Sequence, residues 1–147
     1  MTLKTDASIA TVYDAAQKDW TPRPLFLSGV SAGFPSPAED HVDRQLDLND
    51  LLIRHPAATF FVRVAGDSMV GAGIQHNDIL IVDRSLEAVS NRIVIAVVNG
   101  ELTVKRLVRD RHGARLVAEN PHYPPLALTE ENGCEIWGVV TGVVRQF

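Results

Sequence analysis

The chain lacks both paired cysteines and long apolar runs. Cys134 is the only cysteine among 147 residues, so no disulfide can form within one chain, and a reducing, cytoplasmic location is expected. No apolar run approaches the roughly 18 to 20 residues that span a bilayer, so we expect no membrane segment. Residues 30–32 have small side chains like those before a secretory cut, but the compact apolar stretch ahead of them covers only residues 25–27. We therefore expect no secretion signal.

The sequence also lacks an excess of positive charge and any cluster of residues spaced to bind a metal. The formal net charge is −4, which does not supply the positive field that duplex DNA binding usually needs. No His or Cys spacing suits zinc, and Asp40, Asp43 and Asp47 are typical of a solvated face, so we expect no metal and no cofactor. A protein partner or a peptide substrate is favoured over sequence-specific DNA.

The residues that are present suggest two parts. Hydrophobic residues make up 46% of the chain, which predicts a compact core. Four prolines fall between positions 22 and 37, and proline fixes φ and removes a hydrogen-bond donor. Residues 1–40 are therefore predicted to be an extended, mobile N-terminal arm, with one short helix at about residues 8–18. Residues 41–147 are predicted to form the folded domain.

The pattern after residue 41 predicts one short helix followed by strands. Leucines recur at helical spacing in residues 46–53, with Asp47 or Asn49 as the candidate cap. From Thr59 onward the apolar period changes to two, and Asn99-Gly100 is a strong hairpin signal. The predicted strands begin at Thr59 and cover residues 79–82, 92–98, 101–108, 115–118 and 136–144. We expect a mostly antiparallel, barrel-like or sandwich β domain.

One serine lies in a loop that could support chemistry. Ser68 follows a predicted strand in the segment Gly66-Asp67-Ser68-Met69, and more glycines follow at 71 and 73. Glycines let a bound chain come close, and consecutive N–H groups could stabilise an oxyanion. A serine beside glycines is more often a simple turn residue, however. The spacing also differs from the Gly-x-Ser-x-Gly elbow of α/β-hydrolases.

A nucleophilic serine needs a base, and two kinds of residue are available. The five histidines lie beside the predicted helix or in loops, and none has a specific spacing to Ser68. Lys105 lies in a predicted strand rich in valine, where burial would lower its pKa and allow it to act as a base. The alternative is that Lys105 faces solvent beside Arg106.

Several separate motifs decide between these alternatives. They are Gly-Phe-Pro-Ser-Pro-Ala at 33–38, Asp-Leu-Asn-Asp-Leu-Leu-Ile at 47–53, His-Pro at 55–56, Gly-Asp-Ser-Met at 66–69, Asp-Ile-Leu-Ile-Val-Asp at 78–83 and Thr-Val-Lys at 103–105. In this order they resemble the LexA/UmuD-type Ser–Lys self-cleaving peptidases. The resemblance covers roughly residues 32–145 and implies a LexA- and signal-peptidase-like β domain.

The resemblance also implies roles for individual residues. Ser68 would be the nucleophile and Lys105 the general base, with the backbone amides of Ser68 and Met69 holding the oxyanion. The family cuts itself before the glycine of its Gly-Phe-Pro segment, which places the cut between Ala32 and Gly33.

Biological expectations follow from the UmuD-type resemblance alone. It implies a homodimer, stimulation of self-cleavage by the RecA–single-stranded DNA filament, and partnership with a Y-family, UmuC-like translesion polymerase in the SOS response. Only 32 residues precede the expected cut, too few for a three-helix DNA-binding domain. Two alternatives stay open: a fragment of a LexA-type repressor, and an inactive β-rich interaction module that keeps the fold without the chemistry.

Overall fold

The structure is a computed structural model and describes residues 8–14, 22–26, 42–131 and 133–147. The chain divides into two compact units. The larger unit, called the β domain here, comprises residues 1–15 and 55–147, and the smaller unit comprises residues 16–54.

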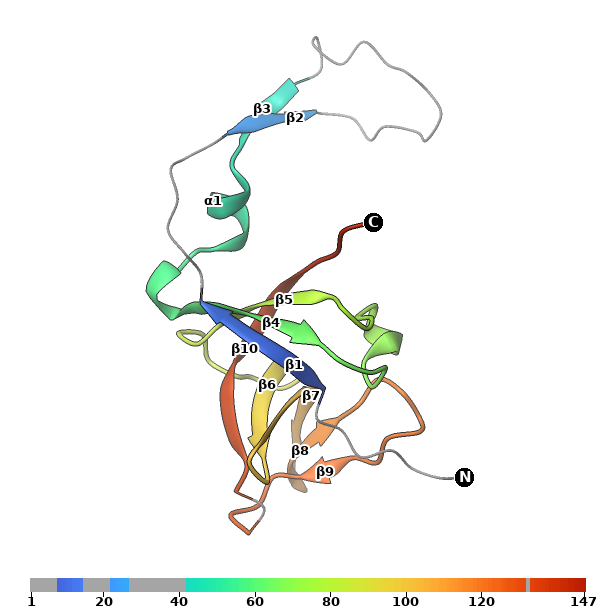
Figure 1. Cartoon of the computed structure of the whole chain (residues 1–147). Helices are drawn as coiled ribbons and strands as arrows, with labels where there is room; N and C mark the ends of the chain where they lie inside the picture. Colours follow the sequence, from blue (N-terminus) through green and yellow to red (C-terminus); the bar gives the residue numbers. More distant parts are fainter. Residues whose placement is uncertain (1–7, 15–21, 27–41, 132) are drawn as a thin grey trace. The chain divides into compact units, whose positions relative to one another are not determined.

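The β domain is built around one eight-stranded antiparallel sheet (Figure 1). Its strands lie in the order β1-β4-β5-β10-β6-β7-β8-β9. Their bounds are β1 Ile9–Asp14, β4 Thr59–Val64, β5 Ile79–Asp83, β6 Ile93–Val98, β7 Glu101–Asp110, β8 Gly113–Val117, β9 Leu126–Ala127 and β10 Glu135–Val144. The sheet curls, so that the beginning of β1 at one edge comes beside β7. The prediction of a mostly antiparallel β fold is confirmed.

The β6–β7 hairpin shows how local sequence sets the register of the sheet. Asn99 and Gly100 both have positive φ, 50° and 80°, as a type I′ turn requires. This turn pairs Val98 with Glu101 and continues the ladder to Ile93 and Arg106. Lys105 consequently lies opposite Val94 in the middle of the sheet.

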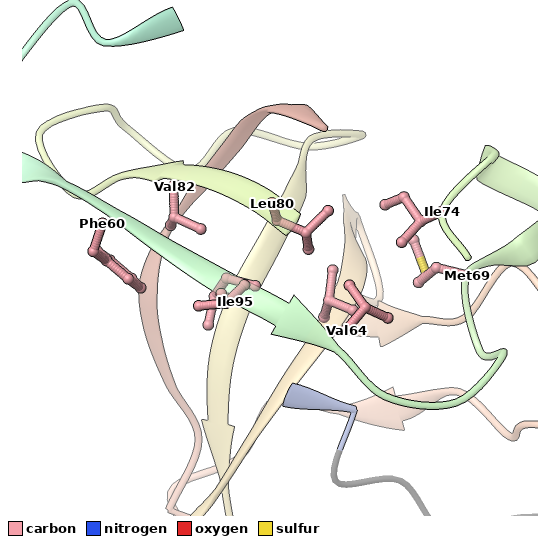
Figure 2. Packing of buried hydrophobic residues seen from close by; sticks show 9 residues of the cluster. Phe60, Val64, Met69, Ile74, Leu80, Val82 and Ile95 are labelled. Carbon is pink, nitrogen blue, oxygen red and sulfur yellow. The ribbon is translucent and has the colours of Figure 1, made fainter. Parts of the chain in front are cut away.

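A cluster of buried hydrophobic side chains packs on the inner face of the curled sheet (Figure 2). Alternate residues of β4, among them Val62 and Val64, point inward, as a period of two dictates. Met69 and Ile74, from the loop after β4, pack against this cluster and are almost fully buried. The loop that carries Ser68 is therefore anchored to the core on its apolar side.

In the part of the chain that the structure describes, the smaller unit contains one antiparallel strand pair and one α-helix. Strands β2 (Arg23–Phe26) and β3 (Val42–Leu46) pair antiparallel, and helix α1 (Leu48–Leu52) follows. Asp47 caps the helix, because its Oδ1 accepts a hydrogen bond from the Asn49 N–H at 2.7 Å. The predicted helix at this position is confirmed, and Asp47 is the cap. The β domain resumes at residue 55, and a short 3₁₀ turn, η2 (Pro56–Ala58), leads into β4.

The prediction of a helix at about residues 8–18 is wrong for residues 9–14, which the structure describes. Residues Ile9–Asp14 form strand β1, which pairs with β4. The sequence Ile-Ala-Thr-Val-Tyr is rich in β-branched and aromatic residues, which favour a strand once a sheet edge is available. Residues 15–18 lie outside the described part of the chain.

The division into a mobile arm of residues 1–40 and a folded domain of residues 41–147 stays a prediction. Strand β1 lies in the β domain, where it pairs along β4, and residues 42–54 lie in the smaller unit.

Asp78 and Arg145 form a salt bridge in the β domain. Asp78 is almost fully buried, and Arg145 holds both of its carboxylate oxygens at 2.6 Å through Nε and Nη2. This hydrogen bonding holds the pKa of the Asp78 carboxyl below its usual range. Arg145 Nη2 also donates to the Gly73 carbonyl at 2.9 Å, which ties the end of the chain to the loop after Ser68.

We predict that Arg145→Gln destabilises the β domain at neutral pH by leaving a buried carboxylate without its partner. Because the folded pKa of Asp78 is lowered, the pair stabilises the fold above the ordinary aspartate pKa of about 4. That contribution is lost as pH falls through the folded value. Urea unfolding at several pH values should therefore show a deficit at pH 7 that shrinks in acid. Arg115→Gln, at the exposed Arg115–Asp110 pair, is the control and should change much less.

Candidate active site

The Ser68 turn lies between β4 and β5 and is held on several sides. Gly66 adopts φ +87°, a left-handed conformation that suits glycine, and its N–H donates to His76 Nδ1 at 3.0 Å. Ser68 is only 2% exposed, and its neighbour Met69 inserts into the core. The turn therefore has little freedom to move the Ser68 hydroxyl.

Residues 119–123 hold the same turn from the opposite side. Asn120 Nδ2 donates to the Asp67 carbonyl at 2.9 Å, and the Tyr123 hydroxyl donates to Asp67 Oδ1 at 2.7 Å. The Gly71 N–H donates to the Glu119 carbonyl at 2.9 Å. A Cβ at position 71 would lie 2.7 Å from that carbonyl oxygen, so only glycine allows this approach.

Lys105 reaches the serine from the middle of β7. Its side chain is 8% exposed, so it does not lie on a solvated face, which was the alternative left open by the sequence. Its Nζ donates to Ser68 Oγ at 3.2 Å, to Thr103 Oγ1 at 2.9 Å and to the Val104 carbonyl at 3.1 Å. Arg106, the next residue, points the other way and pairs with Glu119. The structure thus brings together two residues that are 37 positions apart in the chain.

The surroundings of Nζ are polar but these three partners carry no formal charge. They are two hydroxyl oxygens and one carbonyl oxygen, and the Tyr123 ring centroid lies 5.7 Å from Nζ. Burial disfavours the charged form of an amine, whereas hydrogen-bond acceptors around it stabilise that form.

The backbone N–H groups of Ser68 and Met69 are the predicted oxyanion donors. Within the described residues, neither N–H donates a hydrogen bond to a protein acceptor. Both belong to the same turn as the hydroxyl, and the carbonyl of Met69 is already used by the N–H groups of Ala72 and Ile74. Their role as oxyanion donors stays a prediction.

Ser8 is a site residue that sequence reasoning missed. It precedes β1, is 1% exposed, and its Oγ lies 3.0 Å from Thr103 Oγ1. The Val104 N–H donates to the same Oγ at 2.8 Å. A chain of hydrogen bonds thus runs from Ser8 through Thr103 to Lys105. No local motif marks Ser8, because it lies 95 positions from Thr103 and joins it only through sheet curvature.

The other candidate residues lie elsewhere. His55 Nδ1 hydrogen-bonds Asp83 Oδ2 at 2.6 Å, and none of the histidines in the described part of the chain is a hydrogen-bond partner of Ser68. Burial raises the pKa of the Cys134 thiol, which disfavours its reactive thiolate. Ala32 and Gly33 lie outside the described residues.

Metal ligation and membrane insertion were the other possibilities for the described residues. Among the described residues, no group of three or more His, Cys, Asp or Glu side chains could hold a metal ion. In the same part of the chain, no helix has both the length and the apolarity needed to cross a bilayer.

Comparison with known families identifies the family to which the chain belongs. The family model described as peptidase S24-like matches residues 24–141, which include Ser68 and Lys105. The chain belongs to this family. Membership makes it a serine peptidase by descent and agrees with the antiparallel β fold.

Named relatives place this S24 peptidase more narrowly. Protein ImpA of Salmonella typhimurium is 46% identical over 143 residues, covering 94% of this chain and 97% of ImpA. Protein MucA of Escherichia coli is 44% identical over 119 residues, covering 80% of this chain and 81% of MucA. LexA repressor 1 of Xanthomonas campestris is 39% identical over 121 residues, covering 82% of this chain and 59% of the repressor. The chain is a UmuD-like member of the LexA/UmuD family.

We predict that Gly71→Ala destabilises this S24 peptidase by about 1–3 kcal/mol, because the new Cβ would overpack against the Glu119 carbonyl. Thermal and urea unfolding would measure the loss. Val70→Ala is the matched control in the same turn, since Val70 is exposed and its replacement should change stability by no more than about 0.5 kcal/mol. Equal stability of Gly71→Ala and Val70→Ala would contradict the close packing of the turn.

Proposed function

We propose that this S24 peptidase cuts its own Ala32–Gly33 bond with a Ser68–Lys105 dyad. The observation that carries the proposal is the 3.2 Å approach of Lys105 Nζ to Ser68 Oγ inside the β domain, where both side chains are almost fully buried. Serine is a weak nucleophile at neutral pH, and an adjacent base that accepts its proton makes it reactive.

The hydrogen bonds of Lys105 suit the neutral amine. In the neutral amine, two N–H groups would donate to Thr103 Oγ1 and to the Val104 carbonyl, and the contact with Ser68 Oγ would reverse, with the Ser68 hydroxyl donating to the nitrogen lone pair. Nζ then accepts the hydroxyl proton as Oγ attacks the Ala32 carbonyl carbon. The amine becomes an ammonium group, and the former carbonyl oxygen becomes an oxyanion held by the N–H groups of Ser68 and Met69.

The second half of the reaction returns the proton. Collapse of the tetrahedral intermediate breaks the Ala32–Gly33 C–N bond, and Lys105 gives its proton to the departing amine of Gly33. An ester between Ser68 Oγ and the Ala32 carbonyl carbon remains. Lys105, neutral again, activates a water molecule that hydrolyses this ester and frees Ser68. The products are residues 1–32 and residues 33–147.

The distance along the chain permits more than one route to the cut. The 36 positions between Ala32 and Ser68 would span on the order of 100 Å in a fully extended chain, but this stretch includes β3, α1, η2 and β4. The two proposed routes are cleavage by the dyad of the same chain and cleavage by the dyad of the second copy in a homodimer.

The biological setting is part of the same proposal. Likeness to ImpA, MucA and the other UmuD-like relatives supports cleavage that is stimulated by a RecA–single-stranded DNA filament during the SOS response. The processed chain would then serve as the accessory subunit of a UmuC-like, Y-family translesion polymerase. The removed segment carries three basic and three acidic side chains, so processing changes exposed surface rather than net charge.

We predict that Ser68→Ala and Lys105→Arg each lower the self-cleavage rate by roughly 10³-fold or more. Alanine removes the nucleophile, whereas arginine keeps the positive charge but cannot act as a neutral base. Intact mass would follow conversion of the wild type to residues 33–147, and circular dichroism would verify that both variants fold. Full activity in either variant would contradict the dyad. A wild-type chain that never shortens would favour the inactive interaction module instead.

We also predict that RecA bound to single-stranded DNA accelerates cleavage, and that RecA without DNA does not. The uncut Gly33→Glu chain and the processed chain would be compared for co-purification with a Y-family polymerase and for lesion bypass. Bypass supported equally by both forms would show that processing is not the activating step.

A further inference from the structure

One edge of strand β4 is covered by residues of the segment that cleavage would release. Strand β1 pairs antiparallel with β4, with Thr11 opposite Arg63 and Tyr13 opposite Phe61 (Figure 1). The other edge of β4 is occupied by β5. Strand β1 is thus the last strand on its side of the sheet, and it precedes the proposed cut at Ala32–Gly33.

The direction of each backbone N–H in β4 follows from its alternation. The Val64 N–H donates to the Asp78 carbonyl on the β5 side, whereas the Ala65 N–H donates to the Ser8 carbonyl on the β1 side. By alternation, the N–H groups of Phe61 and Arg63 also face β1. Thr11 and Tyr13 lie opposite them, and beyond the register shift between Ile9 and Thr11 the same alternation directs their N–H groups toward β4 and the N–H of Val12 away from it.

Ser8 anchors the start of this strand beside the dyad. Its hydroxyl oxygen lies 3.0 Å from Thr103 Oγ1 and accepts from the Val104 N–H at 2.8 Å, while Thr103 Oγ1 accepts from Lys105 Nζ. Ile9 packs against the main core cluster. Seating the strand therefore completes the hydrogen-bond chain that ends at the proposed base.

The rest of the strand is held mainly by its backbone. The side chains of residues 10–13 are exposed, including Val12 at 41% and Tyr13 at 44%. Strand β1 thus pairs through its backbone and is anchored at its start by Ser8 and Ile9. Peptides that add to an exposed sheet edge bind in the same way, with backbone hydrogen bonds and a few seated side chains. Such a contact binds weakly unless the strand is tethered to its partner.

We propose that residues 8–14 are a docking strand by which the peptidase recognises its own N-terminal segment, and that the β1-facing edge of β4 with Thr103 and Val104 is the exosite. The inference deepens the proposed function and rests on cleavage at Ala32–Gly33. Docking holds the segment that contains the cut on the β domain and aligns Lys105 through Ser8 and Thr103.

The length of the tether is compatible with this role. Asp14 and Ala32 are 18 positions apart, so the cut lies at most about 60 Å from the end of the docked strand, and the pairing of residues 23–26 in β2 with β3 shortens that limit. Cleavage breaks this tether, and the docking strand then loses its high effective concentration.

A competition experiment on the full chain tests the exosite. A synthetic peptide of residues 8–14 at about 1–5 mM should lower the first-order self-cleavage rate at least two-fold by displacing the tethered strand. The same peptide N-methylated at Thr11 should lose this effect, because a ladder hydrogen bond is removed. N-methylation at Val12 should preserve it, since that N–H faces away from β4. Equal inhibition by both methylated peptides, or no inhibition by the unmodified one, would overturn the proposal.

Variants of the full chain give a second readout. Thr11→Pro should slow self-cleavage about 5–10-fold, and Val12→Pro should slow it less, although both replace an exposed side chain by proline. Hydrogen exchange on the matching Ser68→Ala chains should show lost protection of the Phe61 and Arg63 amides only with Thr11→Pro, with β6 and β7 unaffected.

The outcomes separate this inference from the proposed function. Docking is overturned if the wild type cleaves itself and the two proline variants cleave at equal rates, or if Thr11→Pro cleaves faster than Val12→Pro. Either result leaves the proposed dyad unaffected. A wild-type chain that stays intact overturns both.

Discussion

The placement of one lysine amine inside an apolar sheet is the constraint on which the proposed chemistry depends. Lys105 lies in the middle of β7, and the partners of its Nζ that define the site are neutral oxygen atoms. Burial disfavours the charged form of an amine, and a neutral amine can donate two hydrogen bonds and accept a proton from a third partner. The fold therefore supports a base without a histidine.

The geometry of the site results from long-range packing of short segments. The Ser68 turn follows β4, the lysine comes from β7, residues 119–123 hold Asp67, and Ser8 reaches Thr103 from the start of the chain. Met69 fixes the turn to the core, and Gly71 allows it to approach Glu119. An arrangement of this kind places a nucleophile and a base before any substrate binds, so that little reorganisation is needed during reaction.

Much of this organisation could be predicted from local sequence, and the rest depended on sheet curvature. The strands from Thr59 onward and the Asn99-Gly100 turn carry strong periodic and turn signals, and the Asp47 cap is equally local. Periodicity could not determine whether Lys105 faced solvent or core, because that depends on how the sheet curls. Strand β1 was mistaken for a helix and Ser8 was missed for one reason: each is defined by a partner more than 45 positions away.

If neutral Lys105 is the base, the pH dependence of wild-type self-cleavage reports the loss of its proton. Intact mass recorded over time from pH 6 to 11 would give the rate of conversion to residues 33–147. We expect a rate that rises with pH as Nζ loses its proton and then levels off once the amine is neutral. A rate that is independent of pH, or that falls as the amine is deprotonated while the fold persists, would contradict a lysine base.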